Sequence, residues 1–285
     1  FEPPVELPDR SSFAIARWRR TPLFDRAFRW RVEPPRLAVQ RPEVAAMNLM
    51  SQVHESPYRF DGTEDSSVRS ICLRAMERCP DDADAYVVLA RIYDHRSELA
   101  LSLVDAGLAA TAGRSPEVPA GVSPWCDHLF RDVLRLRFVR AESLLDLGRT
   151  DEAFAEFEEL LRIDPFDGMG AADFYFSALV DAGEYDRAQR LLDRFPDDRS
   201  ATLLWNATLA AYACGEKDTA DARREEAMAA NPHVPAYLLA GRPVEPPDYY
   251  TPGDANEAMI YADRFHGAWR RVRGAREWLG RRSAR

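Results

Sequence analysis

The spacing of small, aromatic and turn-forming residues along the chain predicts pairs of helices. In the clearest stretch, Gly148 is followed five residues later by Ala153, then by Phe157 and finally by Pro165. Glycine permits a tight turn, and alanine lets two antiparallel helices approach closely. The aromatic ring fills the gap between neighbouring pairs, and the proline ends the second helix. The spacing therefore predicts one helix pair over residues 134–167.

The same spacing recurs on both sides of this stretch. A glycine followed five residues later by an alanine also occurs at Gly183–Ala188 and at Gly215–Ala220. Upstream, the aromatic and small residues from Tyr86 to Tyr93 match a first helix. Further pairs are expected over about 49–82, from residue 83, over about 168–200 and over 201–234. Five units at a near-constant period predict an array in which each pair packs on its neighbours.

This pattern resembles the tetratricopeptide repeat. The resemblance implies an all-α fold, in the form of a right-handed α-solenoid of about five helix pairs with a C-terminal helical cap. It also implies that the first helices line a concave face, on which another polypeptide binds.

The ends of the chain do not follow the repeat. We expect an Arg- and Pro-rich arm over 1–48, a repeat array over 49–240 that is interrupted at about 113–126 by a proline-rich segment, and a connector with a helical cap and an Arg-rich tail over 241–285. A short amphipathic helix is expected within 11–31. Asp254 with Glu257 three residues later predicts the N-cap of the helix in the C-terminal region.

The C-terminal region also resembles the suppressor-of-tumorigenicity-7 family over about 231–279. The resemblance is carried by Asn231–Leu239, Gly253-Asp254, Glu257-Ala258, Tyr261-Ala262, Trp269-Arg270 and Gly274-Ala275. It implies a helical repeat fold and an interaction role, and it supplies no catalytic residues. Eukaryotic members of the family are described as membrane proteins. No run here approaches the roughly 18 apolar residues of a membrane helix, so no membrane partner is expected.

Charge is distributed unevenly along the chain. Residues 1–41 carry nine arginines against five acids, and residues 264–285 carry eight arginines against one acid. The stretch between them has a net charge of −20 within a total of −9. The acidic centre predicts a cationic ligand, and it predicts that the N-terminal arm or the C-terminal tail packs against the array or reaches an acidic partner.

Lysine and cysteine usage bear on the source and the compartment. Lys217 is the only lysine among 38 basic residues, a bias typical of GC-rich bacterial genes. The four cysteines are scattered and form no C-x-x-C pair. We therefore expect reduced thiols and a cytoplasmic protein.

Candidate chemistry is sparse. His233 lies between two prolines with no second ligand at metal spacing, and Cys126-Asp127-His128 is the only Cys/His juxtaposition. No glycine-rich phosphate loop and no G-x-S-x-G motif is present. We therefore expect a non-enzymatic protein without catalytic residues, metal or cofactor.

Charged residues also fall within the predicted helices. Arg137 and Arg140 occupy positions where the repeat has bulky apolar residues. Either this repeat is open on one side, or a neighbouring repeat supplies acidic partners. The acidic run from Asp151 to Glu159 is expected to face solvent.

Candidate partner-binding residues are acidic and aromatic residues of the predicted first helices. These are Asp84, Asp94, Phe138, Glu142, Asp173, Asp181, Trp205 and Tyr212. The aromatic members could equally pack between repeats. At the inner-face positions that some arrays use to clamp a terminal carboxylate, this chain has Asp84, Val87, Arg91, Asp173 and Ser177. As a set, these residues have the wrong charge for that ligand.

The sequence thus favours a non-catalytic scaffold or adaptor that binds a basic polypeptide segment on the concave face. The alternative is a regulatory subunit that contacts nucleic acid or a nucleoprotein through its Arg-rich ends, although the acidic centre argues against a broad footprint. A third hypothesis is an enzyme built on the repeats, which would require a convergent cluster of ionisable groups.

Overall fold

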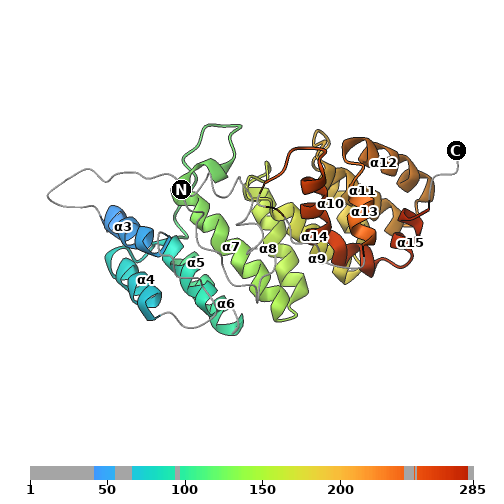
Figure 1. The fold of residues 1–285 in the computed structure, drawn as a ribbon. Helices are drawn as coiled ribbons and strands as arrows, with labels where there is room; N and C mark the ends of the chain where they lie inside the picture. Colours follow the sequence, from blue (N-terminus) through green and yellow to red (C-terminus); the bar gives the residue numbers. More distant parts are fainter. Residues whose placement is uncertain (1–41, 55–65, 94–96, 241–246, 248, 282–285) are drawn as a thin grey trace. The chain divides into compact units, whose positions relative to one another are not determined.

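The computed structural model describes residues 42–54, 66–93, 97–240, 247 and 249–281. Within these ranges every regular element is a helix and no strand is present, which confirms the predicted all-α fold of helix pairs (Figure 1). The elements are α3 (Pro42–His54), α4 (Ser66–Arg78), α5 (Ala83–Ile92), α6 (Ser97–Ala110), the 3-10 helix η1 (Pro124–Cys126), α7 (His128–Asp146), α8 (Thr150–Ile163), α9 (Ala171–Ala182), α10 (Tyr185–Leu192), α11 (Ala201–Ala213), α12 (Lys217–Ala230), α13 (Val234–Leu239), α14 (Ala255–Arg271) and α15 (Ala275–Leu279). The amphipathic helix expected within 11–31 lies outside the described residues.

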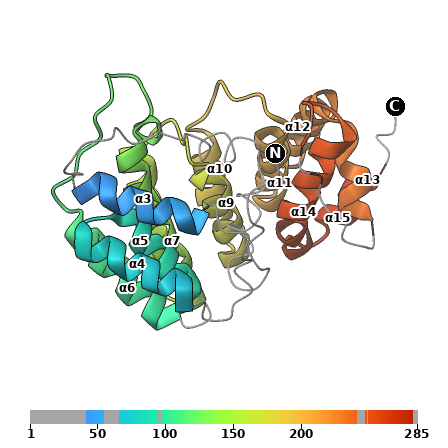
Figure 2. The same ribbon diagram turned by 60° about the vertical axis from the view of Figure 1, so that its left-hand side comes forward.

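The chain forms two compact units, one up to Ala171 and one from Ala172. Three helix pairs build the first unit: α3 with α4, α5 with α6, and α7 with α8 (Figures 1 and 2). Each helix packs against the next along the chain, and α5 also packs against α7, its counterpart in the following pair. Eight of the ten residues of α5 are buried, and the two that remain partly exposed are Asp84 and Arg91.

The turn between α7 and α8 follows the predicted residue pattern. Gly148 has a φ of +70°, a conformation that glycine adopts without the steric cost of a Cβ atom. Ala153 and Phe157 are completely buried in the first unit. The ring of Phe157 meets that of Phe138 edge to face, with centroids 6.0 Å apart. α8 ends at Ile163, two residues before Pro165, as the spacing predicted.

The first helix of this pair is longer than the repeat pattern predicted. α7 begins at His128, whereas the pattern placed the start of the repeat at residue 134. The carboxylate of Asp127 caps the longer helix by accepting hydrogen bonds from the backbone N–H groups of Leu129 and Phe130. Between α6 and this cap, the only regular element is the short η1. The N-cap thus sets the helix start, which the repeat spacing does not encode.

The second unit contains two further helix pairs, α9 with α10 and α11 with α12. The C-terminal helix α14 packs against the first helix of each pair. The ring of Phe265 contacts that of Phe176 on α9, and Trp269 meets Trp205 on α11, each edge to face at 6.2 Å. The N-cap of α14 is Asp254, whose carboxylate accepts from the N–H of Glu257, as predicted. α14 therefore closes the first-helix face of this unit.

Candidate functional site

Charged side chains on successive first helices pair with one another in the first unit. A carboxylate oxygen of Asp84 on α5 lies 2.6 Å from Nε2 of His54 on α3, and the other lies 4.0 Å from a guanidinium nitrogen of Arg135 on α7. Arg91 on α5 donates to Glu142 on α7 at 2.8 Å. The side chains of Asp84 and Glu142 are only 15% and 11% exposed. These pairs join α3, α5 and α7 and leave little carboxylate surface for a partner.

Two further carboxyl groups of this unit are buried enough to change their protonation. Burial, together with the nearby charge of Asp84, raises the pKa of Asp82 to about 7. Burial also raises the pKa of Asp132 to about 6, even though the positive charge of Arg135 opposes the rise. The first unit therefore holds carboxyl groups that take up protons close to neutral pH.

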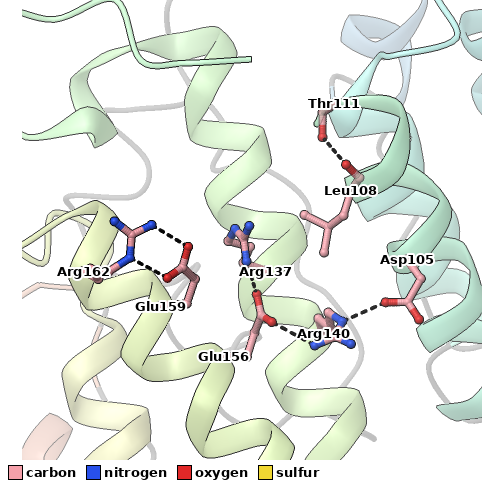
Figure 3. A network of polar contacts seen from close by, with 8 residues as sticks. All are labelled: Asp105, Leu108, Thr111, Arg137, Arg140, Glu156, Glu159 and Arg162. Carbon is pink, nitrogen blue, oxygen red and sulfur yellow. Dashed lines mark hydrogen bonds and ion pairs between the residues drawn. The ribbon is translucent and has the colours of Figure 1, made fainter. Parts of the chain in front are cut away.

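A second charge cluster is centred on Glu156 of α8 (Figure 3). Its two carboxylate oxygens accept hydrogen bonds from Arg137 at 2.7 Å and from Arg140 at 2.8 Å, both on α7. Arg140 also donates through Nε to Asp105 on α6 at 2.7 Å. The arginines at expected apolar positions thus find acidic partners, one in their own helix pair and one in the preceding pair. Of the two alternatives for this repeat, the second holds only for Arg140, which reaches Asp105 in the preceding pair; the other acidic partner, Glu156, belongs to the same repeat.

The expectation that the acidic run from Asp151 to Glu159 faces solvent is wrong for Glu156. This residue is only 7% exposed, because it lies on the side of α8 that packs against α7. Burial of its charge is compensated by the two guanidinium groups. Glu152 and Glu159 instead pair with Arg149 and Arg162 in local contacts near the surface.

In the second unit, two carboxylates of α9 pair with arginines of α14. Asp173 accepts from Nη1 of Arg264 at 2.8 Å, and Asp181 accepts from Nε of Arg271 at 3.2 Å. Part of the basic C-terminal stretch therefore packs against the acidic array, which was one of the expected outcomes. The side chains of Asp173 and Asp181 are 30% and 54% exposed, so these carboxylates are more accessible than Asp84 and Glu142.

The environment of the two α9 carboxylates differs. The guanidinium of Arg264 lies over the ring of Phe174, with its carbon 4.4 Å from the centroid. Burial raises the pKa of Asp173, against the opposing effect of Arg264. Asp181 and Arg271 are both exposed, and solvent weakens such a pair. Asp173 is thus the less exposed of the two carboxylates, and its arginine also contacts an aromatic ring.

The aromatic candidates do not form an exposed face. Phe138 and Trp205 are 2% and 0% exposed, and both pack in their hydrophobic cores, so their assignment as partner contacts is corrected. The indole N–H of Trp205 donates to the backbone oxygen of Asn231. Tyr212 is half-buried and stacks on Trp278 with centroids 4.7 Å apart. Asp94 lies outside the described residues.

The contacts of Asp127 and of the His233 backbone are local. Besides capping α7, the Asp127 carboxylate accepts from the N–H of Glu117 at 2.8 Å. The N–H of His233 donates to Asn231 at the start of α13. In the part of the chain that the structure describes, no three His, Cys, Asp or Glu side chains come together as a metal site requires. Among the described helices, none has the length and apolar content needed to cross a membrane.

The individual basic residues that pair with the candidate acids were not assigned from the sequence, although the C-terminal stretch was expected to pack against the array. His54, Arg91, Arg135, Arg264 and Arg271 each lie on a helix other than that of the acid they meet. A signal for two of them exists, because Arg264 and Arg271 share one face of α14 at a spacing of two helical turns, close to the spacing of Asp173 and Asp181 on α9. A comparison of the two spacings would have predicted that α14 packs against α9.

A comparison with known families supports the repeat assignment of the α7–α8 pair. A family model described as tetratricopeptide repeat matches residues 128–168, which include α7 and α8. The chain is 27% identical over 223 residues to the suppressor of tumorigenicity 7 protein of Macaca fascicularis, a match that covers 69% of this chain and 42% of that protein. It is 28% identical over 236 residues to the suppressor of tumorigenicity 7 protein-like of Rattus norvegicus, with 71% and 41% covered. The matches thus span less than half the length of these relatives.

Among solved structures, the chain is similar to YrrB, which is described as a TPR protein with an unusual peptide-binding site. The TM-score is 0.44 at 17% sequence identity, and the alignment covers 66% of this chain and 84% of YrrB.

Proposed function

We propose that this chain, a tetratricopeptide-repeat protein that resembles the suppressor of tumorigenicity 7 proteins, is a non-catalytic scaffold that binds a basic polypeptide segment. The repeat fold itself indicates a protein–protein interaction scaffold, because stacked helix pairs offer a long surface to a partner. We further propose that the partner segment is basic.

A basic partner is supported by the pairing of the candidate acids with basic side chains. Asp84, Glu142, Asp173 and Asp181 each hold an arginine or histidine from another helix. The first two are largely buried between helices and act as internal ties. Asp173 and Asp181 remain accessible, and an incoming cation can exchange with the arginine of α14. We therefore place the basic segment along α9, at the edges of α14.

The alternative of a nucleic-acid partner receives less support. Within the basic C-terminal stretch, Arg264 and Arg271 are paired with carboxylates, and Arg276 donates to the backbone oxygen of Leu239. Arginines engaged in this way offer fewer contacts to phosphates. A catalytic role receives less support as well, because proteins of this repeat family and fold are generally non-enzymatic.

The test is a titration of the full chain with a fluorescent peptide of alternating arginine and glycine. Binding should weaken between about 50 and about 300 mM salt, because ions screen exposed charges. The variant Asp173→Asn/Asp181→Asn should bind more weakly than the native chain. A matched control, Glu152→Gln/Glu159→Gln, removes two acids from local pairs on the other unit and should have a smaller effect. Affinity that responds to neither salt nor the α9 variant would overturn the proposal.

A further inference from the structure

Asp173 binds its guanidinium group beside an aromatic ring, whereas no ring contact accompanies the pair of Asp181 with Arg271 among the described residues. Arg264 supplies one nitrogen, Nη1, to the carboxylate at 2.8 Å, and its planar group lies over the ring of Phe174. The same guanidinium lies 5.8 Å from the ring centroid of Phe265. Its other terminal nitrogen, Nη2, is buried and has no hydrogen-bond partner among the described residues. The carboxylate therefore binds its resident arginine through a single nitrogen.

The surroundings of Asp173 contain further groups that suit a cation. Tyr250 is 39% exposed, and it lies near enough to Asp173 and Glu257 that their charges add to the effect of burial in raising its phenol pKa. Asp198 is exposed and near enough for its charge to raise the pKa of Asp173. Negative charge thus gathers around Asp173.

Helix α14 does not depend on Arg264 for its position. Phe265 and Trp269 are completely buried, and the hydroxyl of Tyr261 donates to Asn206 on α11 at 3.0 Å. The indole N–H of Trp269 donates in turn to the Tyr261 oxygen at 2.9 Å. The Arg264 side chain, which is 23% exposed, can therefore leave Asp173 while the helix stays in place.

We propose that Asp173, together with Phe174, forms a seat for an arginine side chain of the partner, and that Arg264 occupies this seat when the partner is absent. The inference rests on the proposed binding of a basic segment, and it specifies that Asp173 binds an arginine of that segment. Exchange of one arginine for another replaces the single contact of Arg264 by an arginine that is free to orient toward the carboxylate.

The seat should favour arginine over lysine. A guanidinium is planar, can donate two parallel hydrogen bonds to a carboxylate and stacks on aromatic rings, whereas an ammonium does none of these. Asp181 offers a contrast on the same helix, because no ring contact accompanies its exposed pair with Arg271 among the described contacts. It therefore serves as a matched control for a change from carboxylate to amide.

The experiment uses the full chain and two fluorescent peptides of equal charge, one with three arginines separated by alanines and one with lysines in their place. Arg264→Met removes the resident charge and keeps a long side chain; it should strengthen binding of the arginine peptide about three- to tenfold, because a competing ion pair and a cation–π contact are lost. Asp173→Asn should weaken arginine binding more than Asp181→Asn does, and it should cancel the gain of Arg264→Met. Circular dichroism melts, with Arg264→Ala as a second variant, verify that each protein is folded.

The outcomes separate this inference from the broader proposal. Binding of the arginine peptide that is unchanged or weakened by Arg264→Met, or reduced equally by Asp173→Asn and Asp181→Asn, would overturn the seat and leave the basic-segment scaffold standing. Equal affinity for the two peptides would also overturn it. Absence of binding to either peptide by the native chain and by Arg264→Met would overturn both.

Discussion

Asp82 and Asp132 show how single residues link the stability of the first unit to pH. Burial raises their pKa values to about 7 and about 6, whereas an aspartate in an unfolded chain has a pKa of about 3.9. The folded protein therefore keeps protons that the unfolded chain has already released. A carboxyl group with a raised folded pKa favours the folded state at low pH and loses that contribution as pH rises from about 4 to about 7.

We expect Asp82→Asn to flatten this dependence. Asparagine can still accept the hydrogen bond that Asp82 receives from the N–H of Ala85, so the helix cap is kept while the charge is removed. The variant should be more stable than the native chain at pH 8 by about 1–2 kcal/mol, a value reduced from the full pKa shift because the residue is partly exposed. Urea unfolding at pH 5 and pH 8 measures the effect. An unchanged difference between the two pH values would contradict the assignment.

Glu156 allows a comparison of buried and exposed ion pairs on one helix. Glu156→Gln leaves Arg137 and Arg140 facing each other without their shared carboxylate, and we expect a loss of about 1–3 kcal/mol, below the usual cost of a fully buried pair because both arginines are partly exposed. The control is Glu159→Gln, whose local pair with Arg162 should contribute about 0–1 kcal/mol. Equal midpoints in thermal melts of the two variants would show that the Glu156 cluster adds nothing specific.

At the level of the helix pair, Ala153 and Ala220 test the close approach that the repeat pattern requires. Both are completely buried on the second helices of their pairs. Replacing either by leucine forces additional carbon atoms into a packed contact and should cost about 1–3 kcal/mol. Ala155 is exposed on the same helix as Ala153, so Ala155→Leu provides the matched control. Thermal melts in which Ala153→Leu and Ala220→Leu match this control would show that neither position is a close contact.

The helix pairs could be predicted from the sequence, but the distant segments that cover them could not. Gly148, Ala153 and Phe157 identify the α7–α8 pair because the repeat encodes local geometry: a turn, a close contact and a filled gap. The burial of Trp205 could not be foreseen in this way. It depends on Trp269, which lies on a helix far along the chain and outside the repeat pattern. Periodicity identifies the packing face of a helix, but not the distant segment that covers it.

The candidate site follows the same rule. Asp173 and Asp181 were recognised as charged positions on a first helix, and the basic C-terminal stretch was recognised as a possible partner. Which arginine meets which aspartate depends on the path of α14 across the second unit. Glu156 was misjudged for a related reason, since the solvent-facing side of α8 cannot be deduced without its neighbour α7.

At the scale of the whole chain, α14 acts as the terminal cap of the repeats in the second unit. It covers the first helices α9 and α11, whose aromatic side chains would otherwise meet water. Trp269 is central to this cap: it is completely buried, meets Trp205 and donates to Tyr261. Trp269→Ala should therefore cost about 3–5 kcal/mol, as is usual for removal of a large buried aromatic side chain.

Hydrogen–deuterium exchange read by mass spectrometry can locate this loss. In Trp269→Ala, peptides from α9, α11 and α14 should exchange faster, because these helices meet at the rings of Phe265 and Trp269. Peptides from α4 and α5, which belong to the core of the first unit, provide the internal reference. The variant Trp278→Ala is a useful comparison, since Trp278 is only half-buried and stacks on Tyr212 at the edge of the unit. Exchange in α9 and α11 that is unchanged by Trp269→Ala, or altered equally by Trp278→Ala, would mean that α14 is not the cap of this unit.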